Sequence, residues 1–292
     1  PAQRDVPSFV AFGDIDNHAY GLKTNFFGPA YDPIVLNSDG MGQQRDETRD
    51  MLLPPPCLDL SQFERRTALL RSLNNQLNAI EAADPILEGL DRFQQTSFNL
   101  LRSPRLRDAL DLTREPAQVA ERYGRNSHGR RVLAGRRLIE AGVPFVYTHF
   151  ESNGDHHGPN FRACNPKLPN LDNAVASLIE DLDQRGLLST TIVAVLGEMG
   201  RTPRINRESG RDHWGTTQSV FVAGGGFRPG TVVGATDRHA AYVVDRYYRV
   251  ESFGRTLYHL LGIDPDQTVY TVEGRPMRLI ADNAPLIRQA LV

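Results

Sequence analysis

The sequence predicts an α/β fold in which a parallel or mixed sheet carries helices on both sides. Two observations support this prediction. From residue 130 onward, strand-sized apolar runs alternate with amphipathic helical stretches, and a glycine follows each of those helical stretches. The length of 292 residues suits one large α/β domain or two small ones.

The first part of the chain predicts one strand, a long loop and a group of helices. Residues 8–12 are short and almost wholly apolar, as in a buried strand. Residues 13–56 are rich in Gly, Pro, Asn and Asp and predict a long ordered loop. Residues 61–121 show leucines at helical spacing behind a capping-box pattern. We predict that they form a helical insert within a single domain of residues 1–292.

The alternation of helices and strands then follows in order. Helices are predicted at residues 131–141, 171–185 and 252–261, and each is followed by a glycine: Gly142, Gly186 and Gly262. Strands are predicted at residues 143–148, 191–196 and 219–223. The run at 191–196 is nearly all apolar, which is typical of a strand covered on both faces.

Composition excludes several classes of function. The formal net charge of -2 shows no basic excess, so we expect no nucleic-acid partner. Apolar stretches stay far below the roughly 20 residues of a membrane helix, so we expect no membrane span. The two cysteines, Cys57 and Cys164, are too few for a thiolate metal cluster, and whether they pair stays open.

The start of the sequence predicts a processed or truncated chain. It begins at Pro1 with no initiator Met and no signal pattern, and it leads directly into a strand. A preceding segment could hold a targeting signal, which would make the protein periplasmic or exported; otherwise it would be cytoplasmic.

Residue types that bind metals gather in loops next to the predicted strands. In open α/β sheets, functional groups collect beyond the C-terminal ends of strands. The loops in question are residues 149–158, 197–202 and 211–215, followed by a fourth segment at 237–239. Carboxylates together with imidazoles suit Zn²⁺ or Mn²⁺, while Ca²⁺ and Mg²⁺ stay open. A single Asp-His pair is more often a surface ion pair, so the prediction depends on several such loops coinciding.

Competing motifs are missing from the sequence. It contains no phosphate loop of the Gly-x-x-x-x-Gly-Lys-Ser/Thr type, no Gly-x-Ser-x-Gly elbow and no His-Glu-x-x-His helix. Arg201 and Arg211 are candidates for binding an anionic oxyacid group by paired hydrogen bonds. Ser152 and Thr202 are hydroxyls near the candidate ligands, although turn formation is the commoner role for such residues.

Four motifs closely resemble one family. They are Gly-Glu-Met-Gly-Arg-Thr-Pro-Arg-Ile-Asn at 197–206, Gly-Arg-Asp-His-Trp at 210–214, Ala-Gly-Gly-Gly at 223–226 and Gly-Ala-Thr-Asp-Arg-His at 234–239. The chain thus resembles the mostly bacterial, sulfatase-like family catalogued as domain of unknown function 1501, in the alkaline-phosphatase superfamily. This resemblance implies a three-layer α/β/α sandwich with a mostly parallel central sheet.

The sequence departs from the family pattern in three places. The usual Gly-Trp-Asp-x-His element reads Asn-Gly-Asp-His-His at 153–157, without the Trp. Glu198 and Met199 stand where active relatives often have an Asp-His pair. The N-terminal strand of the family, which in the superfamily precedes a metal-binding Asp and the Ser/Thr or modified Cys nucleophile, cannot be mapped on this chain. The chain by itself is therefore predicted to be a poor catalyst.

The resemblance and the loop positions together imply the site. The predicted metal ligands are Asp155, His157, Glu198, Asp212 and His213. Arg201 is predicted to contact the anion, with Arg211 as the second candidate, and the residues predicted to support the ligands are His149, His156 and His239.

The function implied is that of a metal-dependent hydrolase of sulfate or phosphate esters, or the C-terminal portion of one. Its substrate would be a small anionic ester, such as a sulfated or phosphorylated saccharide. The alternative is a non-catalytic binding or cell-surface protein that retains the sulfatase-like fold. The oligomeric state stays open.

Overall fold

The chain divides into two compact units. One comprises Pro1–His149 with Thr271–Arg275, and the other comprises Phe150–Tyr270 with Pro276–Val292. A computed structural model of the chain describes residues 6–13, 27–28, 31–36, 65, 69, 72, 103–150, 155–271, 273–280 and 283–292. The prediction of a single domain over the whole chain stays a prediction.

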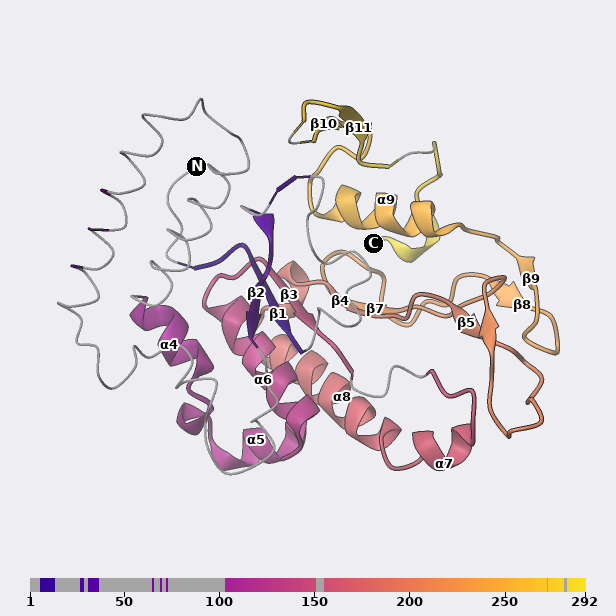
Figure 1. Ribbon diagram of the computed structural model, residues 1–292, viewed down its shortest axis with the longest axis horizontal. Coiled ribbons are helices and arrows are strands. Elements are labelled where there is room, and N and C mark those ends of the chain that lie inside the picture. Colours follow the sequence, from indigo (N-terminus) through magenta and orange to yellow (C-terminus); the bar gives the residue numbers. More distant parts are fainter. Residues whose placement is uncertain are drawn as a thin grey trace. The chain divides into compact units, whose positions relative to one another are not determined.

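A three-stranded parallel sheet forms the centre of the first unit (Figure 1). Its middle strand β1 (Phe9–Phe12) pairs with β2 (Ile34–Leu36) on one side and with β3 (Phe145–Thr148) on the other. Three of the four β1 residues are buried, as expected for a central strand whose faces are both covered. The strands predicted at 8–12 and 143–148 are confirmed.

The helices of the first unit pack around α6, Ser127–Glu140. The side chain of Asn126 caps α6 by accepting a hydrogen bond from the Gly129 N–H at 2.9 Å. The predicted helix at 131–141 is thus confirmed and begins earlier than expected. The other helices are α4 (Pro104–Leu110), the 3-10 turn η2 (Leu112–Arg114) and α5 (Ala117–Tyr123).

The predicted helical insert is described only in part. Within residues 61–121, Arg65, Leu69 and Ser72 are helical, and α4 and the start of α5 fall in the C-terminal portion. The remaining residues of this prediction, from 61 to 102, lie outside the described part of the chain.

A buried ion pair stabilises the first unit. The Arg136 guanidinium is fully buried in α6 and lies 2.8 Å from the carboxylate of Glu115, which precedes α5. Arg137 contacts the same carboxylate and also donates to the Ala109 carbonyl at 2.7 Å. Burial alone would raise the pKa of Glu115, but hydrogen bonds and charges from the two arginines outweigh it and lower that pKa.

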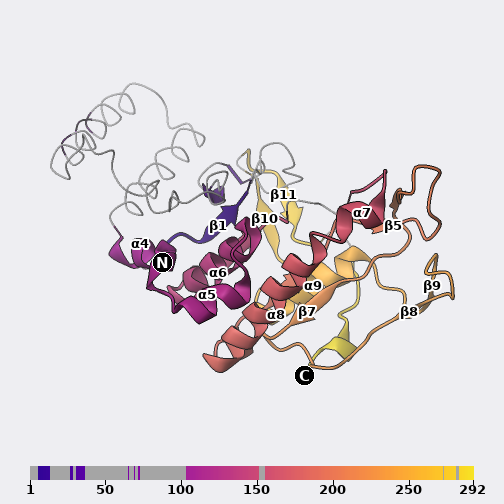
Figure 2. The ribbon, with the colours of Figure 1, turned by 90° about the horizontal axis from the view of Figure 1, so that it is seen from below.

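The second unit places helices on both sides of a two-stranded antiparallel pair (Figures 1 and 2). The pair is β4 (Val193–Val195) with β7 (Phe221–Ala223); α8 (Leu168–Gln184) lies on one side and α9 (Val250–Leu260) on the other. Shorter elements are α7 (Asn160–Cys164), η3 (Leu188–Thr190) and η4 (Arg288–Ala290). Both long helices end where predicted, at Gly186 with φ 69° and at Gly262 with φ 71°.

Three short antiparallel ribbons complete the second unit. They are β5 (Gly200–Arg201) with β6 (His213–Trp214), β8 (Ala235–Thr236) with β9 (Val243–Asp245), and β10 (Thr268–Tyr270) with β11 (Pro276–Arg278). No described helix is long and apolar enough to cross a membrane. Cys164 is a free thiol, and Cys57 lies outside the described residues.

The environment predicted for residues 191–196 is wrong. The strand itself exists as β4, but Ala194 is exposed and Leu196 is 53% exposed, so it is not covered on both faces. Among the described strands, β4 pairs with β7 alone and in antiparallel orientation. An apolar run indicates that a segment forms a strand, but tertiary structure determines which other strands pair with it. The mixed α/β class is confirmed, whereas the three-layer arrangement with one mostly parallel sheet stays a prediction.

Candidate metal centre

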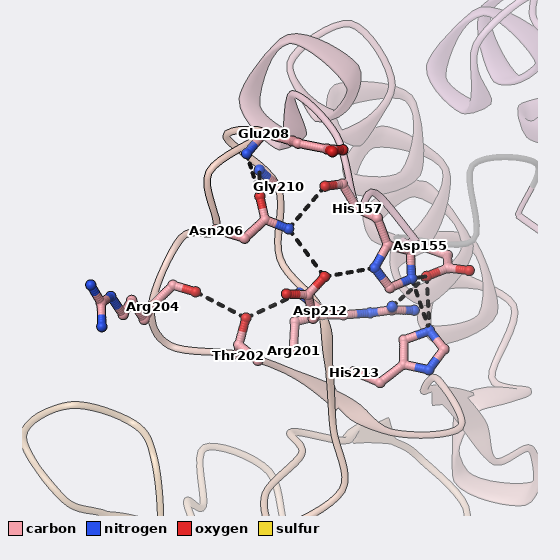
Figure 3. A network of polar contacts seen from close by, with 10 residues as sticks. All are labelled: Asp155, His157, Arg201, Thr202, Arg204, Asn206, Glu208, Gly210, Asp212 and His213. Atoms are coloured by element: carbon pink, nitrogen blue, oxygen red, sulfur yellow. Dashed lines mark hydrogen bonds and ion pairs between the residues drawn. The ribbon is translucent and has the colours of Figure 1, made fainter.

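One carboxylate and two imidazoles converge in the second unit (Figure 3). Asp155 Oδ1 lies 3.0 Å from His157 Nε2 and 3.0 Å from His213 Nε2. The two Nε2 atoms are 3.3 Å apart. All three side chains are between 42% and 49% exposed, so the group is open to solvent.

The spacing of these three atoms fits a divalent metal ion. A tetrahedral zinc site with bonds of about 2.0–2.1 Å has ligand atoms roughly 3.3 Å apart. The observed separations of 3.0, 3.0 and 3.3 Å are close to that value and leave a fourth position for water or substrate. Two imidazoles favour Zn²⁺ or Mn²⁺ over Ca²⁺ and Mg²⁺, which prefer oxygen ligands throughout.

The β5–β6 ribbon positions two of the groups at this site. Arg201 and His213 are paired residues of its two strands, so their side chains leave the same face. Arg201 contacts Asp155 Oδ1 at 2.5 Å and Glu198 Oε1 at 3.5 Å. Glu198 is therefore linked to the cluster through the guanidinium of Arg201 and is not one of the three converging donors.

Asp212 lies on the far side of the His157 ring. The His157 Nδ1–H donates to Asp212 Oδ1 at 2.8 Å, which turns Nε2 toward Asp155. A carboxylate behind a metal-binding histidine fixes its tautomer and ring orientation. Asn206 Nδ2 donates to the same Asp212 oxygen at 3.0 Å and holds it in place.

The contacts of the site shift three pKa values. The hydrogen bond to Asp212 raises the pKa of His157. The pKa of Asp212 is lowered by hydrogen bonds from His157 and Asn206. The pKa of Asp155 is lowered first by the hydrogen bond from His213 and then by Arg201. Both carboxylates are therefore ionised near neutral pH, and His157 gains a proton more readily than an ordinary histidine.

A tight turn around Asn206 brings the two ligand loops together. Asn206 Oδ1 accepts hydrogen bonds from the Gly210 N–H at 2.8 Å and the Glu208 N–H at 3.0 Å. Its Nδ2 also donates to the His157 carbonyl at 3.0 Å. Gly210 lies so close to His157 that a Cβ at position 210 would be 2.0 Å from that carbonyl oxygen. Asn206 was not among the predicted site residues, although an Asn whose side chain can bond the backbone two residues further on is typical of such turns.

The other predicted residues have different surroundings. The Arg211 guanidinium donates to the Thr202 and Pro203 carbonyls at 2.6 and 2.8 Å and so braces the loop. His156 accepts a hydrogen bond from the Arg211 N–H through its carbonyl at 3.0 Å. The His239 ring accepts from Arg238 Nε at 2.9 Å and is not one of the three converging donors.

Three further residues named from the sequence are His149, Thr202 and Ser152. His149 belongs to the first unit, where its N–H donates to the Phe12 carbonyl at 3.2 Å. The Thr202 hydroxyl donates to the Arg204 carbonyl at 2.9 Å and accepts from the Asp212 N–H at 3.0 Å, as expected of a turn-forming hydroxyl. Ser152 lies outside the described residues.

The fold and the site together define a mixed α/β protein with a candidate metal centre of one carboxylate and two imidazoles. The chain belongs to the family described as "Protein of unknown function (DUF1501)", whose model matches residues 1–291. The resemblance of the sequence motifs to domain of unknown function 1501 is thereby confirmed, whereas the sulfatase-like character stays a prediction. Comparisons with curated proteins and with solved structures found no match.

Proposed function

We propose that this chain is a metal-dependent hydrolase of sulfate or phosphate esters, or the C-terminal portion of one. The observation that supports the proposal is the convergence of Asp155, His157 and His213 at 3.0–3.3 Å, with Asp212 behind His157. The resemblance of the surrounding motifs to sulfatase-like proteins supports the reaction class by analogy.

In this proposal, some of the side chains bind the metal and another binds the substrate. Asp155, His157 and His213 would hold a divalent cation, and Asp212 keeps the His157 ring turned toward it. When bound, such a cation lowers the pKa of a bound water or polarises an ester oxygen. Arg201, which contacts Asp155, would bind the anionic group of a small sulfate or phosphate ester, such as that of a substituted saccharide.

One observation favours a second function. The Thr202 hydroxyl, a candidate nucleophile by its position, is engaged by backbone groups on both sides. The same three-donor group would then bind a metal, and through it an anionic ligand, without turnover. This is the non-catalytic alternative, which shares the metal centre but not the reaction.

The test compares the purified chain with two histidine variants. Aryl phosphates and aryl sulfates are supplied with Zn²⁺ or Mn²⁺, and metal content is measured by elemental analysis. Metal-dependent turnover that is lost in His213→Ala and retained in His239→Ala supports the hydrolase, since His239 is an exposed histidine of the same unit that is not one of the three donors. Binding of one metal without turnover supports the alternative. Failure to bind any metal contradicts both.

A further inference from the structure

The two faces of the β5–β6 ribbon differ in composition. Successive side chains of a strand point to opposite faces. Arg201 and His213 are cross-strand partners on the face that reaches Asp155. Gly200 and Trp214 are partners on the opposite face. The position of the His213 ring therefore depends on what holds Trp214 behind it.

Trp214 is fixed by a loop further along the chain. Its indole Nε1–H donates to the Ala241 carbonyl at 2.8 Å. The Tyr242 ring meets the indole edge to face, with centroids 5.9 Å apart. Gly200 permits close approach on the same face, because a Cβ there would be 1.8 Å from the Thr217 carbonyl oxygen.

Asp237 builds the loop that presents the Ala241 carbonyl. Its Oδ1 accepts hydrogen bonds from the His239 and Ala241 N–H groups, both at 2.9 Å. Its own N–H donates to the Tyr242 carbonyl at 2.9 Å. Ala240 takes a left-handed conformation with φ 56°, which a non-glycine residue adopts only where its surroundings hold it. A single carboxylate thus organises the turn that ends at the Trp214 anchor.

Two threonines strengthen the same contact. The Thr216 hydroxyl donates to the Ala241 carbonyl at 3.0 Å, and the Thr217 hydroxyl donates to the Ala240 carbonyl at 3.4 Å. Both threonines follow Trp214 closely in the chain. The loop at 237–242 is therefore bound to the segment that carries His213 at several successive positions.

We propose that Asp237 and Trp214 are positioning residues for the metal-binding imidazole of His213. Asp237 shapes the loop at 237–242, the Ala241 carbonyl holds the Trp214 indole, and the indole fixes the ribbon that aims His213 at Asp155. This inference rests on the proposed function, because it takes the metal site as given. Within residues 237–239, Asp237 is thus the residue that supports the metal site, whereas the sequence had pointed to His239.

The experiment measures Zn²⁺ affinity of the 292-residue chain by calorimetric titration, with unfolding curves showing each variant to be folded at the temperature used. Asp237→Ala should weaken binding about 10–100-fold, as loss of a group that orients a metal ligand does. Asp237→Asn keeps the accepting oxygen and should restore binding to within about threefold of wild type. Trp214→Phe, which removes the indole N–H and part of the ring from the anchor, should weaken binding about tenfold.

Controls separate positioning from general loss of stability. Asp266→Ala removes another exposed loop carboxylate of the second unit, one that pairs with Arg255, and should leave affinity unchanged. Asp237→Ala combined with Trp214→Phe should bind no more weakly than the poorer single variant, because both act through one contact. If Asp237→Ala and Trp214→Phe bind like wild type while His213→Ala does not bind, the positioning role is wrong and the metal site stands. If His213→Ala also binds like wild type, both proposals are overturned.

Discussion

Each residue of the candidate metal centre has its own role, which depends on the neighbour that each of its side-chain atoms contacts. His157 uses Nε2 toward Asp155 and Nδ1 toward Asp212, so one ring links the donor group to the turn around Asn206. His213 and Asp212 are adjacent in sequence, yet one faces the donor group directly and the other faces it through His157.

Removing the Asp212 carboxylate should lower the pKa of His157. The hydrogen bond to Asp212 favours the protonated ring, so Asp212→Ala should bring that pKa back toward the ordinary histidine value. A pH titration of the histidine ring signals by NMR, with metal absent, measures it. Asp266→Ala, which removes an exposed carboxylate paired with Arg255, serves as the control and should leave the pKa of His157 unchanged. An unshifted His157 pKa in Asp212→Ala would contradict the assigned contact.

Glycine at position 210 should be required for stability, unlike glycine at position 158. A Cβ at 210 would meet the His157 carbonyl oxygen at 2.0 Å, whereas a Cβ at 158 would meet nothing within 4 Å. Gly210→Ala should therefore lower the free energy of unfolding by about 1–3 kcal/mol or more, as overpacking does. Gly158→Ala is the matched control and should change it by less than about 0.5 kcal/mol. Equal unfolding curves in urea for the two variants would refute this packing.

Among the elements, α6 draws part of its stability from a buried ion pair. Glu115→Gln removes one of the two carboxylates that pair with the buried Arg136 guanidinium and leaves only the half-exposed Glu140 at 2.7 Å, so the free energy of unfolding at neutral pH should fall by up to about 3–5 kcal/mol. Since the folded-state pKa of Glu115 is lowered, its stabilisation exists above the unfolded pKa and disappears as pH falls through the folded pKa.

The pH dependence of the unfolding free energy distinguishes the contribution of the Glu115 charge from that of side-chain packing. The difference in unfolding free energy between wild type and Glu115→Gln should shrink steadily as pH drops below about 4. Urea denaturation at several pH values between neutral and acid measures it. A difference that stays constant over that range would mean that the ionised carboxylate is not what stabilises α6.

Local patterns predicted the elements well where local forces decide them. The glycines at 142, 186 and 262 end helices because they adopt positive φ with values of 97°, 69° and 71°. The sheet partners of β4 and the exposure of Leu196 could not be predicted, because they depend on distant segments. The Glu115–Arg136 ion pair could not be predicted either, because it joins residues from separate elements.

The candidate site shows the same division between local pattern and tertiary placement. Three of the five predicted ligands, Asp155, His157 and His213, converge because their loops are held together by the turn at Asn206. Residue type alone could not separate them from Asp212 and Glu198, which contact the cluster through His157 and Arg201. Only the direction of each side chain makes that distinction.

For the whole molecule, the donor group and its supporting loops fall within one of the two units. Asp155, His157, His213 and Asp237 all belong to the second unit, and Glu115 belongs to the first. Glu115→Gln should therefore leave Zn²⁺ affinity of the folded chain within about twofold of wild type, while it lowers the free energy of unfolding. Calorimetric titration at a temperature where the variant is folded measures this. A large loss of affinity would show that the first unit contributes to the site.

The most direct test of the central claim is a crystal structure of the chain grown with Zn²⁺, with the metal located by its anomalous scattering. We expect one strong peak within about 2.0–2.2 Å of Asp155 Oδ1, His157 Nε2 and His213 Nε2, with Asp212 still hydrogen-bonded to His157 Nδ1. A metal bound by other residues, or no metal at these three atoms at a saturating concentration, would contradict it.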